Sequence, residues 1–179
     1  TTYAVVNGNN MDINAQDMGG AIRISATDLV VTEVCDNIID GIASNGRLEG
    51  GGIRIGGSNN SGISAVVNAT VNNNYIAPIS GGGIRIIALD EITTTVNNNV
   101  VTGAKGGGIR IGWNCYNNNT ITSEVNATIT GNLVADNYAV GIHVEGSESL
   151  NGLIQNNVVL NTRECESSQA RYNHPGIYV

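Results

Sequence analysis

One short string recurs along this chain and limits what the chain can fold into. Gly-Gly-Ile-Arg-Ile, or a close variant of it, occupies residues 19–24, 51–55, 82–86 and 107–111, and weaker copies occupy 140–144 and 175–179. Repetition at intervals of a few tens of residues indicates a solenoid. Each unit of a solenoid stacks on its neighbours because it is too short to bury a hydrophobic face alone.

A second motif lies between these copies: an apolar residue, two spacers, Asn, any residue and another apolar residue. Its six Asn are Asn9, Asn37, Asn74, Asn99, Asn132 and Asn157, at successive spacings of 28, 37, 25, 33 and 25 residues. In three units the Asn precedes the first Ile of the next Gly-Ile-x-Ile segment by 10 residues. The chain holds 27 Asn, a composition typical of disordered tracts, but this locked spacing opposes disorder.

Each unit is predicted to contain three short strands. The first is the Gly-Ile-Arg-Ile segment, the second is the run before the aligned Asn, such as 68–72, and the third is the pair after it, such as 75–76. Apolar residues alternate with period two between Gly and Asn, and no segment has helical apolar spacing. We expect the aligned Asn to adopt the left-handed backbone conformation at a sharp bend, and the stacked amides to hydrogen-bond along the solenoid.

Over nearly the whole chain this pattern resembles the right-handed parallel β-helix of the pectate-lyase-like superfamily. The resemblance implies an all-β, three-sided, right-handed parallel β-helix of about six coils, with an Asn ladder at the turn between the second and third strands. The six aligned Asn match that place. We expect one domain over residues 1–179, without evident capping elements. Because this fold carries lyases, hydrolases, adhesins and inert scaffolds, it does not set the function.

The Arg of each Gly-Ile-Arg-Ile strand is expected to face water, since the two Ile beside it point to the core. Stacking at ~4.8 Å predicts a column of side chains, which consists of Arg23, Arg54, Arg85, Arg110, His143 and Tyr178. Like charges at this spacing repel, so the column requires anions. The anions are either carboxylates of the chain itself or those of a bound anionic polysaccharide. The candidates within the chain are Asp28, Glu49, Asp90, Glu91 and Glu145.

An enzyme is the less favoured hypothesis. The resemblance implies that a lyase would hold its substrate along the first-strand face with Arg or Lys as the base, so Arg85, Arg110 and His143 would be tested first. The turns at 77–81 and 102–106 are too short to wall a cleft. No acidic cluster clearly matches a calcium site, and the exposed row lacks the paired carboxylates of a hydrolase. We predict no catalytic residue, metal or cofactor, with lyase-like activity as the alternative.

Charge and composition limit the classes of partner that the chain can bind and indicate where the protein is located. A net charge of −7, with Lys105 the only Lys, opposes binding to nucleic acid or to an anionic membrane surface. No apolar run approaches the ~20 residues of a membrane span. The three Cys form no CxxC motif, and we expect thiols, although this odd count allows one disulfide at most within the chain, or pairing between chains. Sequons that fit a secreted or cell-surface glycoprotein begin at Asn59, Asn68, Asn118 and Asn126.

The ends of the sequence suggest a self-associating fibre. The chain begins at a second strand and ends just after a first strand, so one copy stops where another would continue. Head-to-tail contacts of this kind do not close and generate filaments, with a rise of ~29 Å for six stacked coils. We therefore predict a secreted, non-catalytic structural solenoid whose partner is itself. The alternative is a domain that grips an anionic polysaccharide through Arg23, Arg54, Arg85, Arg110 and His143.

A third hypothesis is ice binding. It rests on Thr and Asn at outward positions of the second strands, namely Thr70, Asn72, Thr95, Asn97, Thr128 and Thr130. Glu33, Cys35, Leu153 and Gln155 interrupt these columns. The ordinary preference of Thr for strands explains the pattern equally well at this point.

Overall fold

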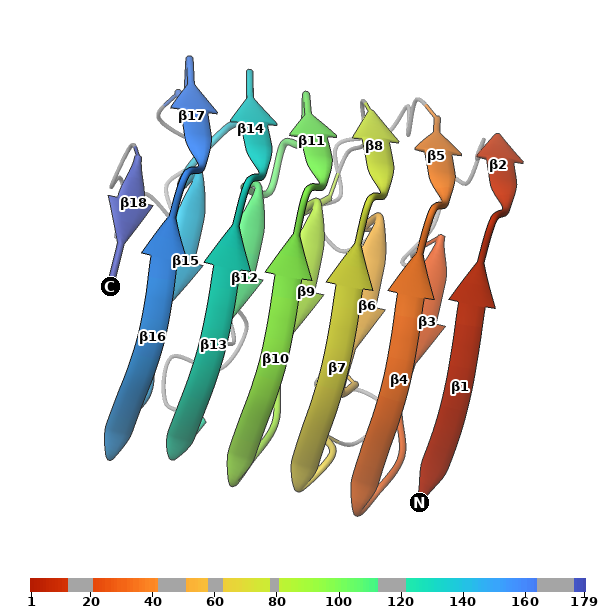
Figure 1. Ribbon diagram of the computed structural model, residues 1–179, viewed down its shortest axis with the longest axis vertical. Helices are drawn as coiled ribbons and strands as arrows, with labels where there is room; N and C mark the ends of the chain where they lie inside the picture. The colour runs from red at the N-terminus through yellow and green to blue at the C-terminus, as the bar shows by residue number, and fades with distance from the viewer. Residues whose placement is uncertain (13–20, 42–50, 58–62, 78–80, 113–121, 164–175) are drawn as a thin grey trace.

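The computed structural model describes residues 1–12, 21–41, 51–57, 63–77, 81–112, 122–163 and 176–179. Every regular element within these ranges is a strand, and the strands form three parallel sheets of six strands each (Figure 1). No described segment forms a helix that is long and apolar enough to cross a membrane.

The long strands form the first sheet, which we call sheet A. They are β1 (Thr2–Asn7), β4 (Leu29–Cys35), β7 (Val66–Asn72), β10 (Glu91–Asn97), β13 (Glu124–Thr130) and β16 (Ser149–Gln155). Sheet B contains β2 (Asn10–Asp12), β5 (Ile38–Asp40), β8 (Tyr75–Ala77), β11 (Val100–Thr102), β14 (Leu133–Ala135) and β17 (Val158–Leu160). Sheet C contains β3 (Ile22–Ile24), β6 (Ile53–Ile55), β9 (Ile84–Ile86), β12 (Ile109–Ile111), β15 (Ile142–Val144) and β18 (Ile177–Tyr178).

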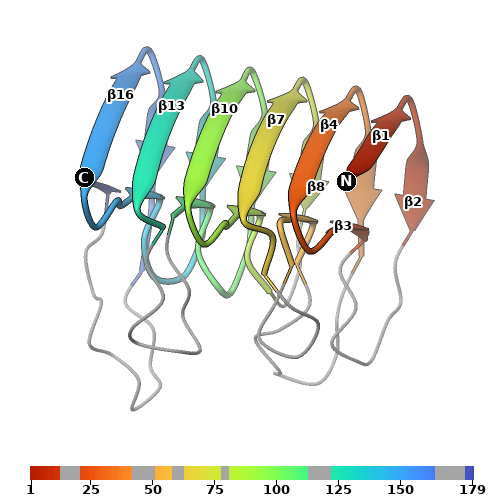
Figure 2. The same ribbon diagram turned by 90° about the horizontal axis from the view of Figure 1, so that it is seen from below.

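Each coil passes through sheets A, B and C in turn, and each strand pairs with the equivalent strands of the neighbouring coils. In Figure 1 the strands of sheet A run upward in front and those of sheet C run downward behind, while the coils advance from β1 to β16. This winding is right-handed, the hand that parallel crossover connections favour. Figure 2 shows the coils side by side along one axis, with β1 and β16 at opposite ends. The predicted right-handed, three-sided parallel β-helix is confirmed.

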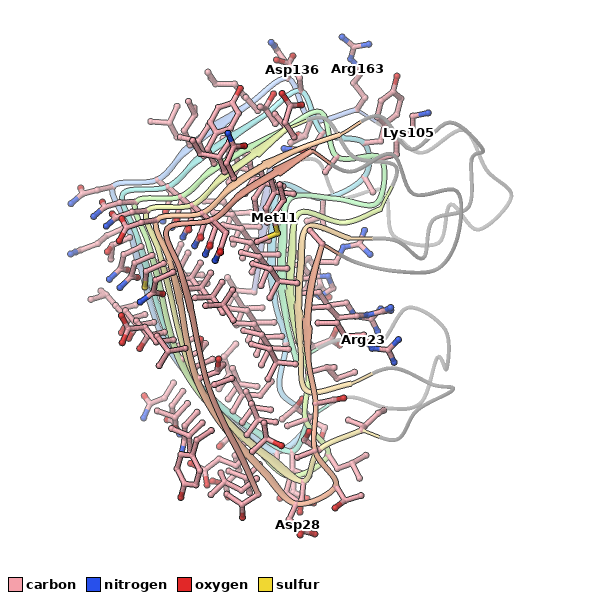
Figure 3. All side chains as sticks on the ribbon, turned by 90° about the vertical axis from the view of Figure 1, so that its right-hand side faces the viewer. Met11, Arg23, Asp28, Lys105, Asp136 and Arg163 are labelled. Atoms are coloured by element: carbon pink, nitrogen blue, oxygen red, sulfur yellow. The ribbon has the colours of Figure 1, made fainter. Side chains whose placement is uncertain are left out.

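The core fills the space between the three sheets with Ile, Val and Ala. In β7 and β10 buried residues alternate with half-buried or exposed ones along the strand, as period-two patterning predicts. Both Ile of each Gly-Ile-Arg-Ile strand point inward, and those of β6, β9 and β12 are fully buried. Figure 3 looks along the axis, with Met11 directed into the interior and Arg23 directed away from it. Inward Ile and outward Arg therefore follow from the pleat of one short strand.

The glycine before β6, β9, β12 and β15 is required by close approach to its neighbours. A Cβ atom at Gly52 would lie 2.7 Å from Ile76 Cγ2 and 2.8 Å from Gly83 O. Equivalent obstructions, from a Val of sheet B and a carbonyl of the next coil, face the other glycines of this column, which are Gly83, Gly108 and Gly141. The corner between sheets B and C is too narrow for a side chain, which explains why the string recurs with Gly before Ile.

The Asn ladder is confirmed and runs in one direction along the solenoid. Nδ2 of each ladder Asn donates to Oδ1 of the ladder Asn in the next coil, at 2.9, 2.9, 2.9, 3.0 and 2.8 Å from Asn9 through to Asn157. The main-chain N–H of each donor residue bonds to the same oxygen. In the middle of the ladder, Asn99 Nδ2 also donates to Val71 O at 2.8 Å. The ladder thus satisfies buried polar groups that would each cost about 1–3 kcal/mol if left unpaired.

The expected backbone conformation of the ladder Asn is wrong by one residue. Positive φ angles occur at the residue before each ladder Asn: Gly8, Asp36, Asn73, Asn98, Gly131 and Asn156, with φ between 55° and 69°. At each of these six positions the residue is Gly, Asn or Asp, the types that adopt this conformation at least cost. The residue before each ladder Asn therefore forms the bend, and the ladder Asn itself contributes the side-chain amide that bonds to the next coil.

Candidate functional site

The outward residues of sheet C form the predicted column. Cα pairing places Arg23 beside Arg54, Arg54 beside Arg85 and Arg85 beside Arg110, and the column continues through His143 to Tyr178. Consecutive members lie one strand spacing apart, ~4.8 Å. Sequence spacing therefore identified the members of this column and their order correctly.

The expectation that the column faces water is wrong for its central members. The exposed fractions of Arg54, Arg85 and His143 are 5, 9 and 4%. Arg110 is half-buried, whereas Arg23 is exposed and Tyr178 is 37% exposed. Stacking accounts for part of this difference, since Arg54, Arg85 and His143 each have a column member on both sides and Arg23 has one, but Arg110 also lies between two members. A long side chain can cover much of the adjacent one along its alkyl stem.

The guanidinium of Arg110 lies over the backbone of a repeat glycine. A Cβ atom at Gly107 would lie 2.7 Å from Arg110 Nη2, 2.8 Å from Arg110 Nε and 3.0 Å from Val140 O. Gly107 also has a φ of 96°, a conformation that L side chains rarely adopt. The glycine-rich segment thus makes room for the Arg head group as well as for the corner of the sheet.

His143, Glu145 and Tyr178 form a compact cluster at the C-terminal end of the column. His143 Nε2 lies 3.0 Å from Glu145 Oε2, and an ionised carboxylate, which only accepts, places the proton on Nε2. The Tyr178 ring meets the imidazole edge to face, with centroids 4.7 Å apart and an interplanar angle of 81°. Burial raises the pKa of the Glu145 carboxyl. The pair has the elements of an acid–base site, but His143 is too deeply buried to contact a polymer directly.

Among the residues that the structure describes, the candidate carboxylate Glu145 contacts the column. Glu145 pairs with His143 as described, and Glu91 instead accepts a hydrogen bond from Thr93 Oγ1 at 3.1 Å. Figure 3 places Asp28 at the corner between sheets C and A, away from Arg23. Glu49 lies outside the described residues. Among the residues that the structure describes, no three His, Cys, Asp or Glu side chains are grouped so that they could hold a metal ion.

Sheet A presents a regular outward array of Thr and Asn. Register pairs Asn68, Thr93 and Asn126 across three strands, then Thr70, Thr95 and Thr128, then Asn72, Asn97 and Thr130. We call these nine residues of β7, β10 and β13 the threonine face. Asn68 and Asn126 begin two of the sequons and lie in the same rank, so groups attached there would project from one side. The other two sequons, at Asn59 and Asn118, lie outside the described residues.

An outward apolar row on sheet B was missed in the sequence. It consists of Ile38, Tyr75, Val100, Leu133 and Val158, which are paired in register and are exposed or half-buried. Each of these residues directly follows a ladder Asn, so the spacing that located the ladder also locates this row. The signal was overlooked because the motif allowed any residue at the position after the ladder Asn.

The one described cysteine is buried. Cys35 is a free thiol at an outward position of β4, and burial raises its pKa. Cys115 and Cys165 lie outside the described residues. The Cys35 thiol is therefore poorly placed for reaction with a partner.

Comparisons of this chain with protein-family models, with curated proteins and with solved structures found no match. The three parallel sheets and the ladder therefore identify a β-helix on structural grounds alone.

Proposed function

We propose that this chain is a secreted, non-catalytic structural solenoid that stacks head-to-tail with further copies of itself into an extracellular filament. One observation carries the proposal. Val5, 71% exposed on β1, and Leu153, 48% exposed on β16, are the two ends of a single outward rank of sheet A. The four members between them are the polar residues Glu33, Thr70, Thr95 and Thr128. In a head-to-tail stack Val5 of one copy would cover Leu153 of the next.

The polarity of the ladder supports a head-to-tail rather than a head-to-head contact. Each ladder Asn donates toward the C-terminal coil and accepts from the N-terminal one, so Asn9 directs Oδ1 and Asn157 directs N–H groups along the axis. A second copy in the same orientation would continue this series. A reversed copy would oppose acceptor to acceptor or donor to donor, which hydrogen bonding does not allow.

The outward column of sheet C supports the same junction. Arg23 and Tyr178 are its exposed ends, and stacking would bring the guanidinium of one copy over the ring of the next. A cation over an aromatic face is attracted by ~0.5–2 kcal/mol. β1 and β16, the outermost strands of sheet A, would pair with each other across the junction, and such contacts repeat without closing.

We further infer that the fold belongs with the β-helices of the pectate-lyase-like superfamily, on its three-sided section and internal Asn ladder. The alternative function, a surface for an anionic polysaccharide, has less support. Of the five candidate ligand residues, Arg54, Arg85 and His143 are buried, which leaves Arg23 and part of Arg110 for direct contact. A glycan that contacts Arg23 and part of Arg110 would gain little affinity, since exposed ion pairs contribute ~0–1 kcal/mol each.

Electron microscopy of the purified chain at neutral pH tests the proposal. We expect unbranched filaments with an axial repeat of ~29 Å, the rise of six coils. Monodisperse single particles at all concentrations would contradict the proposal. A screen of anionic polysaccharides would then test the alternative, with Arg23→Ala expected to weaken any binding.

Three variants of one rank make this test specific. Val5→Glu places a carboxylate at the junction and should raise the critical concentration for assembly roughly tenfold, a change of ~1.4 kcal/mol. Thr95→Glu, in the middle of the same rank, is the matched control and should leave assembly unchanged. Adding Leu153→Lys to Val5→Glu should restore assembly, because residue 153 of one copy would face residue 5 of the next.

A further inference from the structure

We propose that the threonine face of sheet A binds ice, with its hydroxyl and amide groups matching an ordered lattice of water. This inference concerns the side of the solenoid and does not depend on assembly at its ends. The face comprises nine outward residues on three adjacent strands, β7, β10 and β13. It is distinct from the Arg column, which lies on sheet C.

The face is a two-dimensional grid. Thr70, Thr95 and Thr128 are Cα partners across the three strands, so their side chains repeat at the strand spacing of ~4.8 Å. The Asn72, Asn97 and Thr130 rank lies two residues further along each strand, a distance of ~6.6 Å. Both repeats follow from backbone hydrogen bonding. The grid is therefore held by the whole sheet rather than by flexible loops.

The spacing between equivalent residues of successive coils is close to the distance between second-neighbour oxygens in tetrahedrally bonded water. Hydrogen-bonded oxygens lie ~2.8 Å apart. Two such bonds at a tetrahedral angle of about 109° place second neighbours ~4.6 Å apart, because 2 × 2.8 × sin 55° is ~4.6. The strand spacing of ~4.8 Å differs from this distance by roughly 5%. Successive hydroxyls of the Thr rank can therefore bond to alternate oxygens of one ordered water row.

The groups that would contact the lattice are preorganised. Thr is stiff at χ1, so its methyl and hydroxyl hold fixed positions. Thr130 Oγ1 donates to Asn97 Oδ1 at 2.7 Å, and Asn97 N donates to Asn72 Oδ1 at 3.1 Å, which fixes the second rank. Thr70, Thr95 and Thr128 are half-buried residues, and no described residue hydrogen-bonds to their hydroxyls. Binding to a rigid surface then costs little side-chain entropy.

Charge and aromatic content favour water over a polysaccharide as the occupant. The nine residues are uncharged, and Glu91 and Glu33 mark the border of the face on two sides. The nine residues include no aromatic ring, the group on which a sugar would stack. Tyr3, the exposed aromatic residue of sheet A, lies on β1, two strands away from β7. A neutral surface of methyl, hydroxyl and amide groups is suited to a lattice of neutral, hydrogen-bonding molecules.

The test measures how much protein a slowly growing ice crystal incorporates from dilute solution. Protein made without N-glycans is used, since sugars at Asn68 or Asn126 would stand on this face. We expect the unmodified chain to be enriched in the ice fraction and to shape crystals held just below melting. Thr95→Lys should lower incorporation roughly tenfold. Val100→Lys, on sheet B of the same coil, is the matched control and should be incorporated like the unmodified chain.

A second variant at Thr95 and the other possible results each support or overturn the proposal. Thr95→Ala removes the hydroxyl and the γ-methyl without a bulky charge, so it tests the face if Thr95→Lys fails to fold; it should also lower incorporation. Circular dichroism melting verifies that each variant is folded. Exclusion of the unmodified chain from ice overturns the proposal, as does equal incorporation of folded Thr95→Lys and Val100→Lys. Binding to cellulose or chitin particles without ice incorporation would reassign the face to a neutral polysaccharide and also overturn it.

Discussion

The inward Asn ladder and the outward Arg column are both stacks of identical polar side chains, and they solve the stacking problem differently. A side-chain amide carries both a donor and an acceptor, so each ladder Asn satisfies the next at 2.8–3.0 Å. A guanidinium carries only donors and a charge, so an Arg stack cannot satisfy itself. The ladder therefore satisfies its own hydrogen bonds, whereas the column depends on side chains outside it, such as Glu145, which pairs with His143.

The ladder should be the more costly of the two stacks to break. Asn99→Gly removes the amide that accepts from Asn74 N and Nδ2 at 2.9 Å and that donates to Asn132 Oδ1 and Val71 O. Several buried groups then lose their partners at about 1–3 kcal/mol each. We expect the free energy of unfolding to fall by about 3 kcal/mol or more, measured by urea titration.

The adjacent position supplies the control. Asn98 is exposed and has a φ of 55°, which Gly adopts without strain. Asn98→Gly should change the free energy of unfolding by less than about 0.5 kcal/mol. If the two variants lost equal stability, the separation between the bend residue and the ladder residue would be wrong.

That separation also shows what the sequence can and cannot supply. Spacing located the ladder Asn and the members of the Arg column, because strand pairing places equivalent positions in register. Spacing could not show which of Asn98 and Asn99 forms the bend, since both are Asn and Asn tolerates a positive φ. Only the backbone angles show that the first residue forms the bend and the second belongs to the ladder.

Burial of the column was the other feature beyond the reach of the sequence. The strand pleat correctly directs Arg54 away from the core, but outward direction is not the same as exposure. Exposure depends on what surrounds each side chain in the folded chain, which differs between coils with the same local sequence. Arg23 and Arg54 have the same local sequence, Ile-Arg-Ile, and opposite exposure.

The column should respond to mutation according to that exposure, with smaller effects than in the ladder. Arg54→Ala removes a stem packed among its neighbours and should lower the free energy of unfolding by about 1–2 kcal/mol. Arg23→Ala, the same change at an exposed end, should alter it by less than about 0.5 kcal/mol. Urea titration at matched salt measures both. A larger loss at Arg23 than at Arg54 would show that burial does not govern the column.

The smallest change in the free energy of unfolding is expected from Glu145, the carboxylate that pairs with His143 of the column. Burial raises the pKa of the Glu145 carboxyl above its ordinary value, so between those two values the folded chain holds more protons than the unfolded chain. The contribution of Glu145 to the free energy of unfolding should therefore decrease as the pH rises from about 4.3 through the folded-state pKa. Partial exposure keeps this change small.

Glu145→Gln isolates the contribution of this carboxylate. The variant keeps the shape and an acceptor oxygen for His143 Nε2 but no longer titrates. Urea midpoints compared from pH 4 to pH 7 should fall more steeply for the unmodified chain than for Glu145→Gln. If the difference has the opposite sign, the attraction between Glu145 and a protonated His143 outweighs the burial of the carboxyl. The column would then be stabilised by an ion pair with a residue outside it, whereas the ladder is stabilised by amides of its own members.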